Sequence, residues 1–156
     1  MGDRRDDGRF DDTVLRATGA LCLFGVALIH FLDFFGKLSE APYLAALYGV
    51  LMAVTVGAGL TLVLNGARAA WYVGGVAAAL TIGAYVLSRT TGLPSATGDI
   101  GNWHEPLGQA SLFVEGAVVV LSASALTIGA AARRSVAAPA TRRIKETSTT
   151  RSSMTA

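Results

Sequence analysis

Four long apolar segments alternate with short polar connections along the chain. The apolar segments cover residues 14–35, 43–64, 71–88 and 107–131. A bilayer core about 30 Å thick needs roughly 20 apolar residues of helix to cross it, and each segment is close to that length. Lipid offers the backbone no hydrogen-bond partner, so each segment must satisfy its own N–H and C=O groups as a helix. The pattern therefore predicts an all-α fold, a four-helix transmembrane bundle with up-down topology.

The connections contain residues that end and begin helices. Residues 36–42 start with Gly36 and finish on Pro42, whose missing N–H suits the first turn of a helix. Residues 65–68 are short enough for a tight hairpin, and residues 89–106 form a longer connection rich in Gly and Pro. Connections of these lengths place consecutive helices antiparallel.

The distribution of Lys and Arg predicts the orientation of the bundle. All of the 13 Lys and Arg residues except Lys37 and Arg89 lie in the N-terminal region, the second connection and the C-terminal region. Because positive charge is retained on the cytoplasmic side, we expect a multi-pass protein of the plasma membrane with both termini in the cytoplasm. Residues 1–13 and 132–156 are polar, and we predict that both segments are disordered tails.

Composition excludes several classes of protein. Hydrophobic residues make up 52% of the chain, and the charged residues are confined almost wholly to the ends and connections. No basic stripe interleaved with aromatic residues is present, so nucleic acid is not an expected partner, whereas the lipid bilayer is. The single cysteine, Cys22, excludes an internal disulfide. No phosphate-binding loop or hydrolase motif occurs, and no cofactor is predicted.

Small residues recur at every fourth position in two of the segments. They are Ala45, Gly49, Ala53 and Gly57 in the second segment, and Gly75, Ala79 and Gly83 in the third. Small residues at this spacing allow helices to approach closely in lipid. We predict that the second and third helices pack against each other through these faces. A homo-oligomer or a membrane partner using the same faces is the alternative.

Ionisable residues inside apolar segments are costly and call for a reason. The first segment contains His30 and Asp33, the third ends near Tyr85 and Arg89, and the fourth contains Glu115. At 1.5 Å per residue, Glu115 lies about 12 Å and His30 about 9 Å from the outer ends of their helices. Similar depths predict a pair between His30 and Glu115, and a second pair between Asp33 and Arg89. Tyr85 is expected to donate to Glu115 or to His30.

Three interpretations of this polar group remain open. The first is structural, because buried charges pair and thereby fix helix register. The second is a divalent metal site that uses His30 and His104 with Glu105, Asp33 or Glu115, since imidazole and carboxylate suit zinc or copper. The third is a pocket for a small or lipidic ligand, with Glu115 as acid or base.

Three stretches near the outer ends of the segments also carry a resemblance. They are residues 85–94 (YVLSRTTGLP), residues 103–108 (WHEPLG), and Ser111, Leu112 and Glu115, together with His30 in the first segment. In these residues the chain resembles small four-span membrane proteins of actinobacteria that have no assigned activity. The resemblance covers the four spans and neither tail. It implies the topology and the polar group, and it implies no reaction.

The sequence therefore predicts a binding or accessory membrane protein with a polar site on its extracytoplasmic side. The predicted site residues are His30, Asp33, Tyr85, Arg89, His104, Glu105 and Glu115. The alternative is a membrane-embedded metal site, with His30, His104 and Glu105 as candidate ligands. The other form of this alternative is an enzyme that acts on a small or lipidic molecule through Glu115 and His30.

Overall fold

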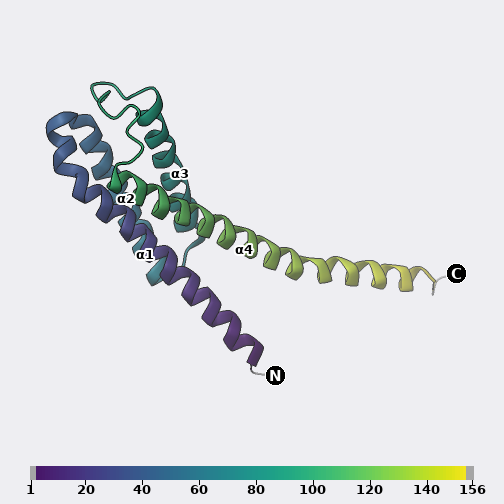
Figure 1. Cartoon of the computed structure of the whole chain (residues 1–156). Coiled ribbons are helices and arrows are strands. Elements are labelled where there is room, and N and C mark those ends of the chain that lie inside the picture. Colours follow the sequence, from purple (N-terminus) through teal and green to yellow (C-terminus); the bar gives the residue numbers. More distant parts are fainter. Residues whose placement is uncertain (1–2, 154–156) are drawn as a thin grey trace.

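Four helices form the computed structural model, which describes residues 3–153. They are α1 (Asp3–Glu40), α2 (Pro42–Leu64), α3 (Arg68–Thr90) and α4 (Pro106–Ser153) (Figure 1). Each contains a stretch long and apolar enough to cross a membrane: Phe10–Glu40, Pro42–Leu64, Arg68–Thr90 and Pro106–Ala131. The chain is a multi-pass membrane protein with the predicted all-α four-helix bundle.

The connections divide the bundle into two ends. Ala41 joins α1 to α2, and residues 91–105 join α3 to α4; we call the end that carries both connections the loop end. The opposite end carries the turn between α2 and α3, and both termini leave the bundle on that side (Figure 1); we call it the tail end. Gly66 makes the α2–α3 turn with a φ of 62°, a left-handed conformation that costs glycine little.

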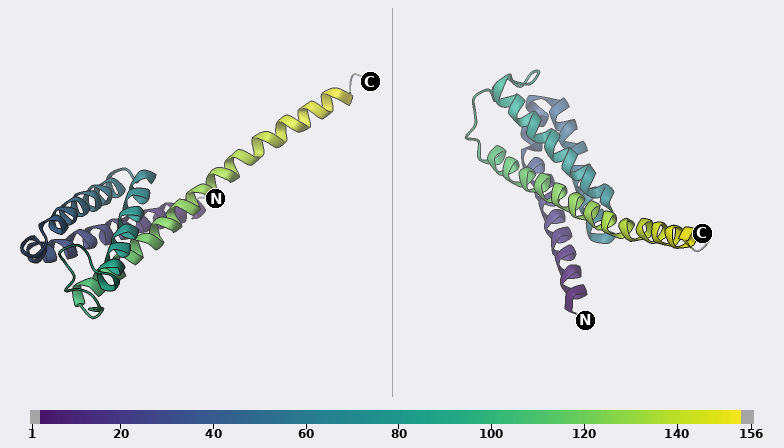
Figure 2. Two further views of the ribbon diagram at one scale, coloured as in Figure 1. Left: turned by 90° about the horizontal axis from the view of Figure 1, so that it is seen from above. Right: turned by 90° about the vertical axis from the view of Figure 1, so that its right-hand side faces the viewer.

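The first and last helices extend beyond the bundle. α1 begins at Asp3 and α4 ends at Ser153, and Figure 2 shows the two extensions diverging from each other. Helix therefore occupies most of both segments that were predicted as tails, and the C-terminal one is rich in Ala and Arg, which favour helix locally. A helix without packing partners is marginal in water, so the disorder of the tails stays a prediction. Residues 1–2 and 154–156 lie outside the described part of the chain.

The helices are arranged in a ring in chain order. α1 and α2 share the most extensive contact, α3 packs on α4, and α4 packs on α1. The contact between α2 and α3 is the least extensive of the four neighbouring pairs. The ring is therefore most loosely closed between α2 and α3.

The core at the tail end is built from large side chains that lie directly against glycines. The ring of Trp71 in α3 occupies the space that a side chain at Gly19 in α1 would need. In the same way the ring of Phe24 in α1 lies against Gly59 in α2. Leu62 is fully buried in this core. Glycine allows the backbones to approach and supplies the room for these aromatic rings.

The predicted packing of α2 on α3 through their small-residue faces is wrong. A side chain at Gly75 would contact Ser122 of α4, while positions 49, 57 and 83 face open space. Of that face in α2 Ala45 is buried, and the other buried residues of the helix are Leu44, Thr55, Ala58, Gly59 and Leu62, because its most extensive contact is with α1. Association with another chain through the exposed small residues stays a prediction.

Candidate functional site

Five polar side chains are buried near the loop end of the bundle. They come from three helices: His30 from α1, Ser88 and Arg89 from α3, and Ser111 and Glu115 from α4. Glu115 has no exposed surface at all. Polar groups this deep in a membrane bundle need partners, and the structure brings most of them together.

His30 and Glu115 form the predicted deep pair. Nε2 of His30 lies 3.8 Å from Oε1 of Glu115, and Ser111 donates a hydrogen bond of 2.7 Å to the same oxygen. The second oxygen of Glu115 has no hydrogen-bond partner among the residues that the structure describes. The prediction that these two residues converge is confirmed, with Ser111 as a third member.

The backbone fixes the role of each nitrogen in the His30 ring. Nδ1 lies 2.9 Å from the carbonyl oxygen of Val26, one turn earlier in α1. A carbonyl only accepts, so Nδ1 carries a proton and Nε2 faces Glu115. Nε2 of a neutral ring and an oxygen of an ionised Glu115 would both be acceptors and would repel each other. One further proton, on Nε2 or on the carboxyl group, removes this repulsion. The edge of the ring also meets Tyr48 of α2, with centroids 4.7 Å apart.

Arg89 does not pair with Asp33 as predicted. Its guanidinium forms ion pairs with Asp99, at 2.8 Å, and with Glu105. Asp33 instead accepts a hydrogen bond of 3.3 Å from Tyr48. The reason is that the α3–α4 connection folds back over the loop end and brings two acidic residues to Arg89.

A second cation joins this ion-pair network. The ammonium group of Lys37 in α1 lies 3.1 Å from Asp99 and 2.8 Å from Glu40. Partial burial acts to raise the pKa of Asp99, but the hydrogen bonds and positive charges of Lys37 and Arg89 outweigh it and hold that pKa below its ordinary value of 3.8. Asp99 is thus an ionised bridge between α1 and α3.

Further contacts hold the α3–α4 connection against the bundle. Tyr43 donates a hydrogen bond of 2.6 Å to the carbonyl oxygen of Pro94, and the backbone N–H of Gly101 donates to the carbonyl of Arg89 at 2.9 Å. A small apolar cluster lies beneath the connection and consists of Ala41, Leu44, Ala96 and Leu93. The connection is therefore packed and bonded at several points along its length.

A cavity of about 420 Å³ lies beneath this network, between α2 and α3. Its polar lining includes His30, Asp33, Lys37, Tyr48, Thr81, Tyr85, Ser88, Arg89, Asp99, Glu105 and Ser111. The rest of its lining is mostly aliphatic and includes Leu47, Val50, Leu51, Val54 and Leu80. The cavity therefore has a polar part toward the loop end and an apolar part toward the middle of the membrane.

The apolar part is bordered by side chains on the outer surface of the bundle. Val50 is 61% exposed and Leu80 is 69% exposed, and both line the cavity from opposite helices. In a membrane, this surface is the one that faces lipid. The cavity consequently opens sideways, at the seam where α2 and α3 have their least extensive contact.

Tyr85 takes a different role from the predicted one. Its ring lies under the guanidinium of Arg89, 4.7 Å from the ring centroid, and close to Trp103. Its hydroxyl donates to neither Glu115 nor His30. Gly108 leaves room for the ring, because a side chain there would collide with it. Tyr85 therefore supports Arg89 through a cation–π contact.

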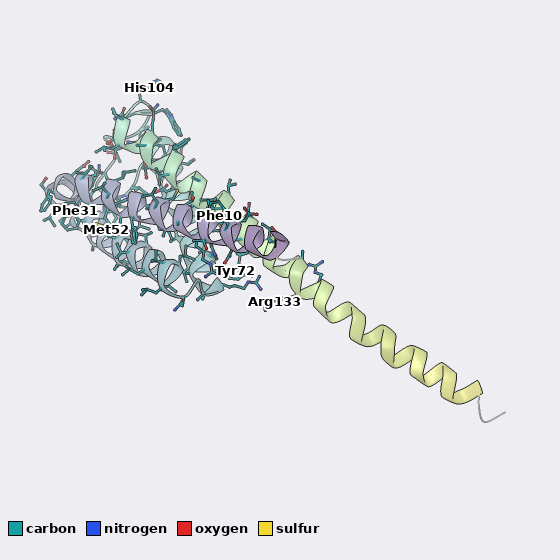
Figure 3. The ribbon with its side chains drawn as sticks, turned by 90° about the horizontal axis from the view of Figure 1, so that it is seen from below. Phe10, Phe31, Met52, Tyr72, His104 and Arg133 are labelled. Carbon is teal, nitrogen blue, oxygen red and sulfur yellow. The ribbon has the colours of Figure 1, made fainter. Side chains whose placement is uncertain are left out.

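His104 does not join the other predicted residues. It is exposed and lies at the edge of the α3–α4 connection, far from Phe31 and Met52 (Figure 3). Among the side chains that the structure describes, no three of His, Cys, Asp or Glu come together as a metal site would need. The candidate set of His30, His104 and Glu105 is thus not assembled in this structure.

Three residues of the site were not among the predicted site residues: Lys37, Tyr48 and Asp99. Lys37 carried a signal, because it is the only basic residue of the first connection. Tyr48 carried none that separates it from other residues near the ends of the spans. Asp99 was expected near the polar group, as an acidic residue of the third connection, but its partners could not be assigned. The roles of Tyr48 and Asp99 depend on how α2 and the α3–α4 connection are placed.

Comparison of the chain with models of known families, with curated proteins and with solved structures finds no match. The site is therefore interpreted from its geometry and chemistry.

Proposed function

We propose that this protein binds a small amphipathic molecule in the cavity between α2 and α3. The observation that carries the proposal is the division of that cavity into a charged part and an aliphatic part. Its volume of about 420 Å³ lies within the range of roughly 300–1,000 Å³ that small-molecule sites occupy. An amphipathic ligand would place its polar group at the loop end and its apolar chain between Leu51 and Leu80.

The position of the opening supports entry from the bilayer. The cavity opens between two membrane-spanning helices whose exposed side chains are aliphatic, such as Val50 and Leu80. A molecule already dissolved in the membrane reaches this seam without crossing water. The membrane is thus the proposed source of the ligand.

The loop end is proposed to face the extracytoplasmic side of the plasma membrane. The support is the distribution of Lys and Arg, which are concentrated at the tail end and the two termini. In a Cys22→Ser background, Thr97→Cys should react with an impermeant maleimide added to intact cells. Thr149→Cys should react only after permeabilisation. The opposite pattern would invert this assignment.

A catalytic role for Glu115 and His30 is the second candidate. The observation that favours it is the buried Glu115 oxygen without a partner, next to an imidazole. Against it, His30 and Ser111 line the cavity whereas Glu115 does not, so a ligand would contact the carboxyl group only through these neighbours. If Glu115→Gln keeps ligand binding and reduces only stability, the catalytic candidate is rejected.

The binding proposal is tested by filling the cavity. Ala84 lines it and Ala79, on the same helix, is exposed outside it. We expect Ala84→Phe to abolish the thermal stabilisation that dodecylamine, dodecanol or dodecyl phosphate gives the protein in phosphatidylcholine nanodiscs. Ala79→Phe, the matched control, should retain it. Equal stabilisation of both variants by all three amphiphiles would overturn the proposal, because the effect would then come from the bilayer.

A further inference from the structure

The charges around the cavity do not balance. Three carboxylates line it, those of Asp33, Asp99 and Glu105, against the two cations Lys37 and Arg89. The excess is therefore negative, and the question is which carboxylate lacks a counter-charge.

Both cations are already paired. Arg89 is bonded to Asp99 and Glu105, and its side chain is only 4% exposed. Lys37 is bonded to Glu40 and Asp99. An anionic group that entered the cavity could pair with Lys37 or Arg89 only by displacing one of their carboxylate partners.

Asp33 is the carboxylate without a cation. Among the residues that the structure describes, its side chain has only the hydrogen bond from Tyr48, at 3.3 Å, and no ion pair. Lys37 stands one turn further along α1, but its ammonium group is directed to Asp99 and Glu40. Asp33 lines the cavity, so its carboxylate is available to a molecule bound there.

The surroundings of Asp33 favour a positively charged group. An unpaired carboxylate at the edge of lipid is costly, and a cation that pairs with it removes that cost. The hydroxyl of Tyr48 contacts Asp33, so the ring of Tyr48 lies nearby, and an aromatic ring adds attraction for an ammonium group. Below them the lining is aliphatic, including Leu47 and Leu51.

We infer that the ligand is a cationic amphiphile, a molecule with an amine head and an alkyl or other apolar chain, and that Asp33 is its counter-charge. This inference rests on the proposed function, since it names the chemical class of the molecule held in the same cavity. The amine would lie between Asp33 and the ring of Tyr48. The apolar chain would run along the α2–α3 seam toward the middle of the membrane.

The test compares three amphiphiles with the same chain: dodecylamine, dodecanol and dodecyl phosphate. We expect dodecylamine to bind the wild-type protein in phosphatidylcholine nanodiscs about tenfold more tightly than dodecanol. A hydrogen bond to a charged group raises the affinity by about this factor. Asp33→Asn should remove this preference, so that dodecylamine binds about as tightly as dodecanol. Asp11→Asn is the matched control: the same change on α1 at an exposed position near the tail end.

The outcomes separate this inference from the proposed function. Stronger binding of dodecanol or dodecyl phosphate, with Ala84→Phe still blocking it, would overturn the cationic class and leave the cavity as the binding site. A preference for dodecylamine that survives Asp33→Asn would overturn the role of Asp33. Failure of all three probes to distinguish wild type from Ala84→Phe would overturn the proposed function itself.

Discussion

The two ends of the bundle are held together by different physical means. At the tail end, Trp71 and Phe24 fill the space that Gly19 and Gly59 leave open, and most contacts are apolar, apart from a hydrogen bond of 3.1 Å from Arg68 to the carbonyl of Leu126. At the loop end, ion pairs and hydrogen bonds connect the helices, and a cavity of about 420 Å³ remains between α2 and α3.

The difference shows how a small membrane bundle can be stable and still have room for a ligand. Close packing against glycine depends on shape and leaves no space to bind anything. Ion pairs such as those of Arg89 fix the helices and the α3–α4 connection from the rim of the cavity, without filling it. The closest packing and the cavity proposed to hold a ligand thus lie at opposite ends of the same helices.

The largest expected effect is at the tail end. Gly19→Val should lower the free energy of unfolding by about 3 kcal/mol, because overfilling a packed core forces the ring of Trp71 to move. Reversible unfolding in mixed micelles would measure it. Gly57→Val is the control: nothing lies near this position, so a change within about 0.5 kcal/mol is expected. Equal losses in the two variants would contradict the tight packing of this end.

The next effect is at the rim of the cavity. Arg89→Met should lower the free energy of unfolding by about 2 kcal/mol, because Asp99 and Glu105 would face each other without their shared cation. Limited proteolysis should at the same time cut residues 91–105 faster. Adding Glu105→Gln should restore part of the loss. An unchanged cleavage rate in Arg89→Met would show that Arg89 does not hold the connection.

A smaller effect is expected inside the loop end. Ser111→Ala should lower the free energy of unfolding by about 1 kcal/mol, because Glu115 loses the one hydrogen bond that it accepts in the structure. Ser124→Ala, further along α4, removes a hydroxyl bonded only to a backbone carbonyl, that of Val120, and should have less effect because no carboxyl group loses a partner. A larger loss in Ser124→Ala than in Ser111→Ala would contradict the buried arrangement of Ser111 and Glu115.

The smallest effect depends on pH. The pKa of Asp99 is lower in the folded protein than its ordinary value of 3.8. Asp99 therefore contributes stability above pH 3.8, and that contribution is lost as the pH falls through the lowered pKa. Asp99→Asn should be less stable than wild type by about 0.5 kcal/mol at neutral pH, and the difference should shrink in acid. A difference that is constant down to pH 3 would exclude this role.

The fold followed from the sequence because each element is determined locally. Residues 43–64 must form a helix in lipid whatever lies beside them, since their backbone groups have no other partners. The cost of placing charge in lipid also predicted that His30 and Glu115 lie together, because two ionisable side chains at equal depth in a bundle are stabilised by pairing. These predictions needed only length, apolar content and helix geometry.

The partners at the loop end could not be predicted in the same way. Arg89 lies as close to the predicted outer boundary as Asp33 does, and depth alone favoured that pair. The structure gives Arg89 to Asp99 and Glu105, because the α3–α4 connection folds back over the helices. How a Gly- and Pro-rich connection folds depends on contacts such as Tyr43 with Pro94, which no periodic pattern encodes.

Length, apolar content and the cost of burying charge were enough to predict that four apolar helices cross a membrane and that a few ionisable residues gather near one end of them. The three-dimensional packing shows in addition that α2 contacts α1 more than α3, which leaves a seam and a cavity beside Asp33. The two kinds of property depend on interactions over different lengths of chain. Membrane insertion depends on the apolar content of one segment, whereas a cavity depends on how four helices and a connection fill space together.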